Sequence, residues 1–378
     1  MSVRPVIPNL WHHPGIHDYN LGAKHPLKPS RLRRLYELLG RIADLDLRTA
    51  QLADDDDIWR VHTPDYWSEV CAIDACLRRG QTAGLVERRQ AIDLKGDTPA
   101  FAGMEAACRA YVGATVDAAR CVAGGANLAF AMGGGLHHAM PGCARGFCIL
   151  NDPAIAVSIL RDRFERVLYV DLDVHHGDGV ETIFRSDRQV LTYSVHEDPS
   201  TLWPRTGHAH EIGPVGTCAN VPLPAGTTGE DWAFAIRETL GPLVDWFRPR
   251  AMVVQCGADV HALDPLAHLA GDIPSYVSGI EELRRLRLPT VVVGGGGYHL
   301  AVTPVTWASV VLTFTGHDTP GQLPADLAAE WEWPDWNGPI GRGFDETNCA
   351  RDPDVRARVE RFHSEILPAM RHRYDAGV

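Results

Sequence analysis

Five apolar runs of the chain end abruptly at polar or glycine-rich residues. The strands that these runs predict cover 127–132, 167–172, 190–195, 251–256 and 290–293. Uninterrupted runs of Val, Ile and Leu are typical of strands that are buried on both faces of a parallel sheet. In such sheets, sites form just beyond the carboxyl ends of the strands. The pattern therefore predicts that the polar residues after these five strands meet at one edge of a sheet.

Segments with helical periodicity alternate with these strands. They cover 103–122, 152–163, 178–185, 229–247, 275–286 and 303–314. Near the start of the chain, Ser30 can cap a helix that turns Leu32, Leu35 and Leu39 toward a core. Alternation of strand and helix implies a parallel sheet with right-handed crossovers, so the predicted fold class is α/β.

The C-terminal part of the chain breaks this alternation. Residues 317–352 are rich in Pro, Trp, Gly and Asp, which predicts an irregular surface excursion. Asp352 and Pro353 can then begin a final amphipathic helix over about 353–371. No Gly/Ser linker or charge block divides the chain, and site-like residues span 137 to 298. We therefore expect residues 1–378 to form one domain.

Composition narrows the possible partners and the location. The net charge of −12 argues against a partner with nucleic-acid phosphates and mildly favours cationic substrates. No apolar run reaches the roughly 20 residues of a membrane-spanning helix, and the start of the chain lacks the pattern of a secretory signal. The nine cysteines are scattered without a C-x-x-C pair, which suits free thiols. We expect a cytoplasmic protein without a direct nucleic-acid or membrane partner.

Acidic and histidine residues alternate after the second of these strands. Asp171, Asp173 and His175 point to the same side of an extended segment, which spaces Asp173 and His175 to chelate one ion. A single Asp-x-His pair is usually structural, but Asp259 after another predicted strand can supply a third ligand. Two carboxylates, one imidazole and an open position for water describe a catalytic zinc site.

Two further candidates follow glycine-rich turns. His137 and His138 come after three glycines, and their natural partners are the carboxylates that the metal leaves free, Asp171 and Asp178. A carboxylate on one ring nitrogen fixes the tautomer and raises the basicity of the other nitrogen. Tyr298 comes after four glycines, where its phenol could approach a substrate oxygen opposite the metal. The sequence therefore indicates a metalloenzyme with acid–base groups.

Six stretches of the chain resemble the zinc-dependent histone deacetylase family, whose bacterial members include acetoin utilisation proteins and acetylpolyamine amidohydrolases. The stretches occur in this order: His25–Arg31, Gly134–His138, Gly146–Asp152, Val170–Glu181, Gly257–Asp259 and Gly294–Tyr298. The resemblance runs from about residue 12 to about residue 315. It implies the arginase/deacetylase fold, which is a three-layer α/β/α domain around a central, mostly parallel eight-stranded sheet.

The resemblance also implies two metal sites. Zinc, or ferrous iron in its place, would be bound by Asp173, His175 and Asp259. A potassium ion near the zinc would share two of these residues. Its ligands would be Asp171, Asp173, His175, Ser194 and the carbonyl oxygen of Val195.

Catalytic and substrate-binding roles follow from the same resemblance. His138 would be the general base and acid, oriented by Asp178, while His137 would lie beside it with support from Asp171. Tyr298 would polarise the acyl carbonyl. A tunnel for an acyl-lysine stem would be lined by Gly146, Phe147 and Trp203, with Asp97 at its rim to grip the substrate backbone.

Several positions depart from typical relatives. Trp203 stands where class I relatives usually carry Phe, which would reshape the tunnel. Leu266 stands where polyamine-selective relatives place an acidic residue, which favours an acyl-lysine over a small acylated amine. His261 lies two residues beyond Asp259, a spacing that is similar to a second metal ligand of ureohydrolases. We expect His261 to be a hydrogen-bonded loop residue or a neighbour of the ligands rather than a ligand.

Four functions remain open on the sequence alone. The leading one is a zinc-dependent amidohydrolase that removes acetyl or other acyl groups from lysine side chains of a protein or peptide. The nearest alternative is an acetylpolyamine amidohydrolase. A ureohydrolase with two manganese ions would leave the histidine pair and Tyr298 unexplained, and a non-catalytic acyl-lysine binding module would not need them.

Overall fold

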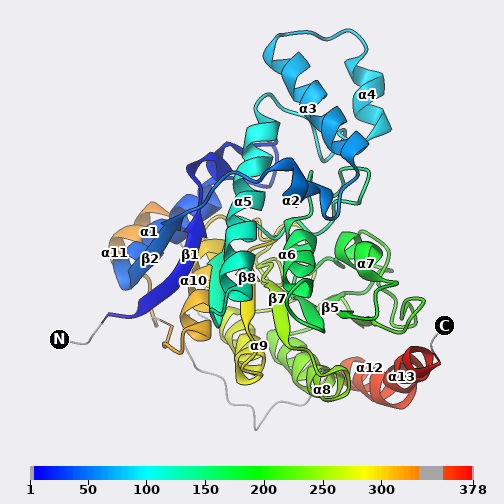
Figure 1. Cartoon of the computed structure of the whole chain (residues 1–378). Helices are drawn as coiled ribbons and strands as arrows, with labels where there is room; N and C mark the ends of the chain where they lie inside the picture. Colours follow the sequence, from blue (N-terminus) through cyan, green and yellow to red (C-terminus); the bar gives the residue numbers. More distant parts are fainter. Residues whose placement is uncertain (1–3, 320, 332–351, 377–378) are drawn as a thin grey trace.

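The computed structural model describes residues 4–319, 321–331 and 352–376 (Figure 1). Its strands form one wholly parallel sheet in the order β2-β1-β3-β8-β7-β4-β5-β6. The strands are β1 Val6–His12, β2 Asp44–Thr49, β3 Leu128–Ala131, β4 Val167–Asp171, β5 Val190–Glu197, β6 Cys218–Leu223, β7 Ala251–Gln255 and β8 Thr290–Val293. The predicted α/β class with an eight-stranded sheet is confirmed.

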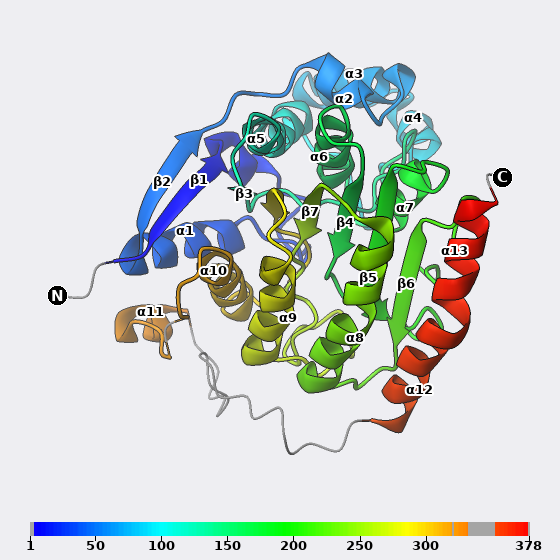
Figure 2. The same ribbon diagram turned by 60° about the horizontal axis from the view of Figure 1, so that its bottom comes forward.

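Helices cover both faces of this sheet and complete the three layers (Figure 2). One face is covered by α5 (Met104–Ala123), which packs on β1, β3 and β8, and by α6 (Asp152–Arg161), which packs on β4 and β7. The other face is covered by α1 (Ser30–Ile42), α8 (Gly229–Phe247), α9 (Ile273–Arg285) and α10 (Val302–Phe314). Every residue of α10 is buried, and hydroxyl residues within it donate back to carbonyl oxygens of the preceding turn, as Thr306 does to Val302.

Further helices occupy the connections. They are η1 (Pro14–Asp18), α2 (Asp55–Trp59), α3 (Pro64–Arg78), α4 (Leu85–Ala91) and α7 (Asp178–Phe184). α3 and α4 form a pair that projects from the sheet beyond α5 (Figure 1). Across the described residues, no helix has both the length and the apolar character that crossing a membrane requires.

The five strands that the sequence predicts are the centre of the sheet. β3, β8, β7, β4 and β5 are consecutive neighbours, and all but β3 are buried along their whole length. The sequence pattern does not predict β1, β2 and β6, which lie outside this centre. β2 alternates charged and apolar residues and is largely exposed, while Pro8 interrupts β1 and Pro222 interrupts β6. Outer strands therefore lack the uninterrupted apolar run.

The C-terminal helix lies along the outer side of β6 (Figure 2). The predicted helix is present as α12 (Pro353–Arg361), a π-helical turn (Phe362–Ile366) and α13 (Leu367–Asp375). The expectation of irregular structure over 317–352 is wrong for Ala325–Glu330, which form α11 and bury Leu327. The part of that expectation on residues 332–351 lies outside the described residues.

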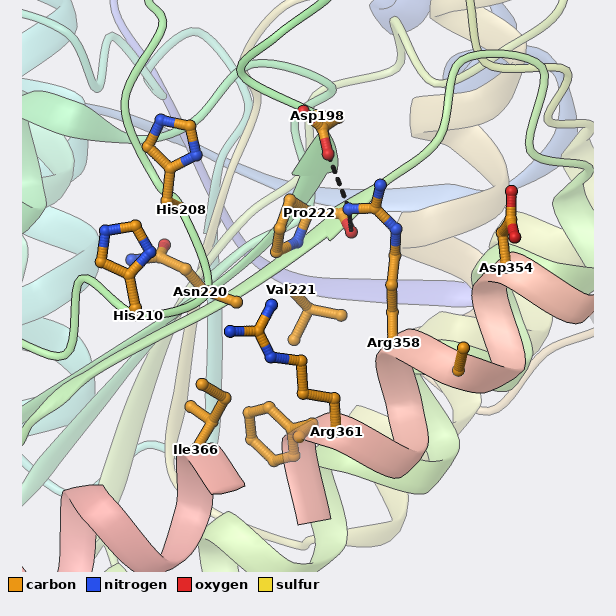
Figure 3. A pocket seen from close by; sticks show the side chains of 13 residues that line it. Asp198, His208, His210, Asn220, Val221, Pro222, Asp354, Arg358, Arg361 and Ile366 are labelled. Carbon is orange, nitrogen blue, oxygen red and sulfur yellow. Dashed lines mark hydrogen bonds and ion pairs between the residues drawn. The ribbon is translucent and has the colours of Figure 1, made fainter. Parts of the chain in front are cut away.

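A hollow of about 510 Å³ lies between α12, β6 and the loop that begins at Asp198 (Figure 3). Arg358 of α12 donates from its guanidinium to Asp198 Oδ2 at 2.6 Å and to the carbonyl oxygen of Pro222 at 2.9 Å. His208 and His210 line the other side with stacked rings whose centroids are 5.5 Å apart. The two hydrogen bonds of Arg358 connect α12 to the loop after β5 and to β6.

Candidate metal and catalytic site

Strand register brings the five central strand ends level with one another. β4 pairs with both of its neighbours so that Asp171 lies beside Ser194 of β5 and Gln255 of β7. Gln255 in turn lies beside Val293 of β8, and Val293 beside Ala131 of β3. The loops that follow these strands therefore begin at the same edge of the sheet, which is where sites of parallel sheets form.

Two of these loops bring three buried candidate ligands together. Asp173 and His175 follow β4, and Asp259 follows β7. His175 Nδ1 lies 3.1 Å from Asp173 Oδ1 and 3.2 Å from Asp259 Oδ2, and the ligand atoms of the three lie within 4.8 Å of one another. Within the part of the chain that the structure describes, no other group of three His, Cys, Asp or Glu side chains is gathered so closely.

The charge of this group favours a bound cation. Burial and repulsion from Asp173 raise the pKa of the Asp259 carboxyl, because two buried carboxylates this close ionise together only at high cost. A divalent ion would compensate both charges. Two carboxylates and an imidazole also match the ligand preference of zinc. The residues present therefore fit the metal that the sequence predicts.

Backbone and amide groups hold these carboxylates. Asp173 Oδ2 accepts hydrogen bonds from Gln255 Nε2 and from the Gly296 N–H, both at 2.8 Å. A Cβ atom on Gly257 would lie 2.2 Å from Asp173 Oδ2, and one on Gly296 would lie 2.0 Å from Asp259 Oδ2. Both positions therefore require glycine. The role of Gln255 could not be predicted from the sequence. The only indication of it there is that a polar side chain ends a buried strand.

The two histidines of the Gly-rich turn form a buried chain of hydrogen bonds. His137 Nδ1 lies 2.7 Å from Asp171 Oδ2, and His138 Nδ1 lies 2.7 Å from Asp178 Oδ1. The two Nε2 atoms are 2.9 Å apart. These are the carboxylate partners that the sequence leads us to expect, and each fixes the orientation of one ring.

Neighbouring charges decide where the protons of this pair lie. Burial raises the pKa of Asp178, but His138 and Arg145 lower it to about 2 overall, so its carboxylate accepts from His138 Nδ1–H. Burial lowers the pKa of His137, but Asp171 raises it to about 9 overall. Burial and the adjacent His137 lower the pKa of His138 to about 3. Asp171 therefore favours the protonated form of His137, while burial and His137 favour the neutral form of His138.

The start of α6 holds the loop that carries the histidines. Asn151 Nδ2 donates to the carbonyl oxygens of His137 and Ala139, both at 2.9 Å. The Asp152 carboxylate accepts from two backbone N–H groups of the preceding glycine turn, both at 2.9 Å. The Asn151 N–H itself donates to His62 Nε2 at 2.8 Å. Asn151 and Asp152 thus position the site, a role that the sequence signals only through the resemblance that includes them.

Tyr298 is held at the edge of this cluster. Its N–H donates to Asp264 Oδ2 at 2.7 Å, and the carbonyl oxygen of Gly297 accepts from the Arg31 guanidinium at 2.9 Å. Burial and nearby carboxylates raise the pKa of the Tyr298 phenol well above its usual value. The phenol therefore keeps its proton at neutral pH and is available as a hydrogen-bond donor.

A tight turn presents Gly146 and Phe147. Arg145 and Cys148 exchange two backbone hydrogen bonds of 2.9 and 2.8 Å across it, and φ is +52° at Gly146 and +69° at Phe147. Positive φ at both central residues defines a type I′ turn. The Phe147 N–H donates to Thr98 Oγ1 at 2.9 Å, and the Phe147 carbonyl oxygen accepts from the Tyr19 hydroxyl at 2.7 Å. These bonds hold a conformation that is unfavourable for a bulky residue.

Trp203 lies against His138. Their ring centroids are 4.6 Å apart with an interplanar angle of 75°. A Cβ atom on Gly146 would lie 2.4 Å from the Trp203 ring and 2.7 Å from the His138 ring. The Phe147 ring meets that of Tyr298 edge-on, with centroids 5.7 Å apart. The structure thus brings the three expected tunnel residues beside His138 and Tyr298.

The other two substrate-binding candidates lie around this cluster. Asp97 is exposed, and its carboxylate accepts from Thr98 Oγ1 at 3.2 Å, the hydroxyl that also holds the turn. Leu266 is half-buried, and its N–H donates to Asp264 Oδ1 at 3.0 Å. Because the other oxygen of Asp264 holds Tyr298, the Leu266 loop is fixed to the site.

The potassium candidates and His261 complete the set of metal predictions. Asp171 Oδ1 accepts from the Asp173 N–H at 3.2 Å. Ser194 Oγ lies 2.8 Å from His196 Nδ1 in the same strand. Asp171 and Ser194 therefore both have hydrogen-bond partners within the protein. His261 is buried, and its Nδ1 accepts from the Leu263 N–H at 3.2 Å. It lies outside the group of three candidate ligands, as we expect for a loop residue.

Comparison with known proteins agrees with this geometry. The histone deacetylase domain family matches residues 25–314. The acetoin utilization protein AcuC of Bacillus subtilis is 36% identical over 84% of this chain and 85% of its own length. Histone deacetylase 6 of Arabidopsis thaliana is 33% identical over 87% of this chain and 70% of its own length. A solved histone deacetylase homologue from Aquifex aeolicus superposes with a TM-score of 0.83 at 26% identity, covering 95% of this chain and 99% of that one.

The fold and the site together define the arginase/deacetylase class of α/β proteins. Within that class, the chain belongs to the histone deacetylase family and is a hydrolase of that family.

Proposed function

We propose that the chain is a zinc-dependent amidohydrolase that removes acetyl or other acyl groups from lysine side chains. The observation that supports this most is the buried group of Asp173, His175 and Asp259 beside the paired His137 and His138. These three side chains would hold the zinc ion, with ferrous iron as an alternative. When bound, the ion supplies a Lewis acid that polarises the amide carbonyl and activates water.

The side chains of the protein move the protons in this proposal. His138 would accept a proton from the attacking water and later return it to the leaving amine, and Asp178 stabilises the imidazolium through Nδ1–H. His137, held by Asp171, would lie beside His138 and support it. The Tyr298 phenol donates a hydrogen bond to the acyl oxygen, where negative charge grows in the transition state.

The walls of the site favour lysine over a polyamine. Phe147 and Trp203 would line an apolar passage that suits the methylenes of a lysine stem, and their rings lie against His138 and Tyr298. At the rim, Leu266 cannot pair with the distant ammonium of an acylated polyamine, and diffuse negative charge elsewhere is screened within about 8–10 Å. In this proposal, Asp97 would bind the substrate backbone.

The remaining parts of the proposal concern the second metal and the setting. A potassium ion would be held by Asp171, Asp173, His175, Ser194 and the Val195 carbonyl oxygen. The whole chain would act as one domain in the cytoplasm, where the eight free cysteines of the described residues would stay reduced.

Matched steady-state assays test the substrate. We expect a higher kcat/KM for an acetyl-lysine peptide than for N-acetylputrescine or N8-acetylspermidine, and loss of all turnover with a metal chelator. A clear preference for the polyamine would contradict the lysine substrate and leave the chemistry intact. Turnover that resists chelation would contradict the metal, and peptide binding without any turnover would instead support the binding module.

A further inference from the structure

Arg145 connects the tight turn at 145–148 to two neighbours of His138. Its Nε donates to Asp178 Oδ2 at 2.7 Å, while the other oxygen of Asp178 accepts from His138 Nδ1 at 2.7 Å. The Arg145 guanidinium also lies over the Trp203 ring, 4.9 Å from its centroid. Because the Trp203 ring in turn meets His138 edge-on, the three side chains close a ring of contacts around His138.

The simplest alternative is that Arg145 makes an ordinary surface ion pair. Such pairs contribute little, because water screens both charges and the long side chains lose entropy. Here the Asp178 side chain is only 5% exposed, and the Arg145 side chain is 36% exposed. A guanidinium can meet a carboxylate with a directed N–H and an aromatic ring with its flat face at the same time, and a lysine ammonium cannot.

The backbone of Arg145 is fixed as well as its side chain. Arg145 and Cys148 are the two hydrogen-bonded ends of the turn that presents Gly146 and Phe147. Movement of the guanidinium would therefore be transmitted to the turn on one side and to Asp178 on the other.

We propose that Arg145 is a positioning residue for the reaction: it fixes Asp178 and Trp203 relative to one another, and so sets the orientation of His138 and the wall of the substrate tunnel. Arg145 acts through these two neighbours and makes no contact with the reacting atoms. The proposal rests on the proposed function for its substrate, and on the contacts of Arg145 alone for its geometry.

A split between kcat and KM tests this role in the zinc-loaded enzyme with an acetyl-lysine peptide. Arg145→Ala should lower kcat by on the order of 10-fold, within the range typical for groups that orient a catalytic side chain, and should also raise KM. Arg145→Lys should recover kcat more than KM, because an ammonium can still donate to Asp178 but cannot stack flat on Trp203. A merely structural role would let Arg145→Lys recover kcat and KM to the same extent.

A double-mutant cycle tests the coupling to Trp203. Arg145→Ala and Trp203→Phe should have less than additive effects on KM, because the second change removes a contact that the first has already broken. Arg185→Ala is the matched control. Arg145 and Arg185 both line one cavity of about 600 Å³. We expect its kcat and KM to stay within twofold of wild type.

A readout without substrate separates this proposal from the proposed function. In protein labelled with ¹⁵N-histidine, the His138 Nδ1–H signal is identified by its loss in His138→Ala. It should shift in both Arg145 variants and not in Arg185→Ala, even if the wild-type enzyme proves inactive on acetyl-lysine. If Arg145→Ala fails to fold, as judged by thermal unfolding and metal content, Arg145→Lys carries the test.

Two results would overturn the role of Arg145. One is an Arg145→Ala enzyme with kcat and KM within twofold of wild type. The other is an unchanged His138 Nδ1–H signal in a folded Arg145 variant.

Discussion

Hydrogen bonds between residues far apart in the chain set the chemistry of the site. Asp173, His175 and Asp259 can be predicted from the sequence, because ligand types at strand ends and motif spacing are visible there. The contacts that Gln255 and Arg145 make cannot be predicted, because each reaches a partner on another element. Sequence spacing thus identifies reactive groups, and only the folded chain shows what orients them.

The metal group gives the first prediction at this scale. Asp173→Ala and Asp259→Ala should each lose the bound metal and all activity, because each leaves too few ligands for zinc. Elemental analysis should find one transition-metal ion per wild-type chain. Two tightly held ions per chain would reject the single-ion site and favour a ureohydrolase.

The acid–base groups should behave differently from the ligands. Tyr298→Phe and His138→Ala should keep the metal and the fold but lower turnover by on the order of 10²–10⁴, as expected for oxyanion and acid–base groups. Metal content and thermal unfolding are the controls, and steady-state turnover is the measurement. Near-normal turnover of His138→Ala would transfer the base role to His137.

His62 makes stability depend on pH. Burial lowers its pKa to about 4, so the unfolded chain takes up a proton here more readily than the folded protein. The contribution of neutral His62 is complete above its ordinary pKa of 6.5 and is lost as the pH falls toward 4, up to roughly 3 kcal/mol in all. In His62→Gln, the amide oxygen can still accept from Asn151. Denaturant unfolding at pH 7 and 4.5 should show a smaller loss for the variant than for wild type, and parallel losses would contradict the assignment.

At the scale of elements, burial explains which parts could be predicted from the sequence. The central strands and α10 are mostly apolar because both sides are covered. β2 contacts protein along one edge only, and α11 buries little beyond Leu327, so neither has a clear apolar pattern. Their position is decided by tertiary contacts, which a local pattern does not contain.

The docking of α12 gives a prediction about one element. Arg358→Ala removes the bonds to Asp198 and the Pro222 carbonyl oxygen and should lower the free energy of unfolding by about 1 kcal/mol or less, because Asp198 and Arg358 are partly exposed. Limited proteolysis should cut α12 and α13 faster. The control is Arg361→Ala, whose partner Glu365 is exposed on the same helical segment. Equal cleavage of the two variants would show that the Arg358 contacts do not hold the helix.

At the scale of the whole molecule, the two edges of the sheet are protected in different ways. α12 and α13 cover the edge at β6, whereas no described strand pairs with the outer edge of β2, where Leu47 is 49% exposed. An open strand edge can pair with another chain unless charges oppose it. In β2, the ion pair of Asp46 and Arg48 flanks Leu47. We infer that these charges keep the edge from associating.

Removing these charges should therefore cause association. Asp46→Val with Arg48→Val should give concentration-dependent oligomers in size-exclusion chromatography. Arg356→Val with Glu360→Val makes the same change in charge and a similar apolar gain on the exposed side of α12, where the helix satisfies its own backbone. We expect this control to elute as wild type does, and equal association of both variants would point to apolar area rather than the strand edge.

The left-handed conformation of Phe147 costs stability at a position that has a role in the proposed function. A bulky residue at positive φ costs on the order of 1–3 kcal/mol, which glycine would largely avoid. Phe147→Gly would thus relieve the turn while removing the ring that faces Tyr298. Selection for heat resistance alone would therefore favour glycine at position 147. Because glycine would widen the proposed substrate passage, a thermostable variant should be tested for loss of discrimination among acyl groups.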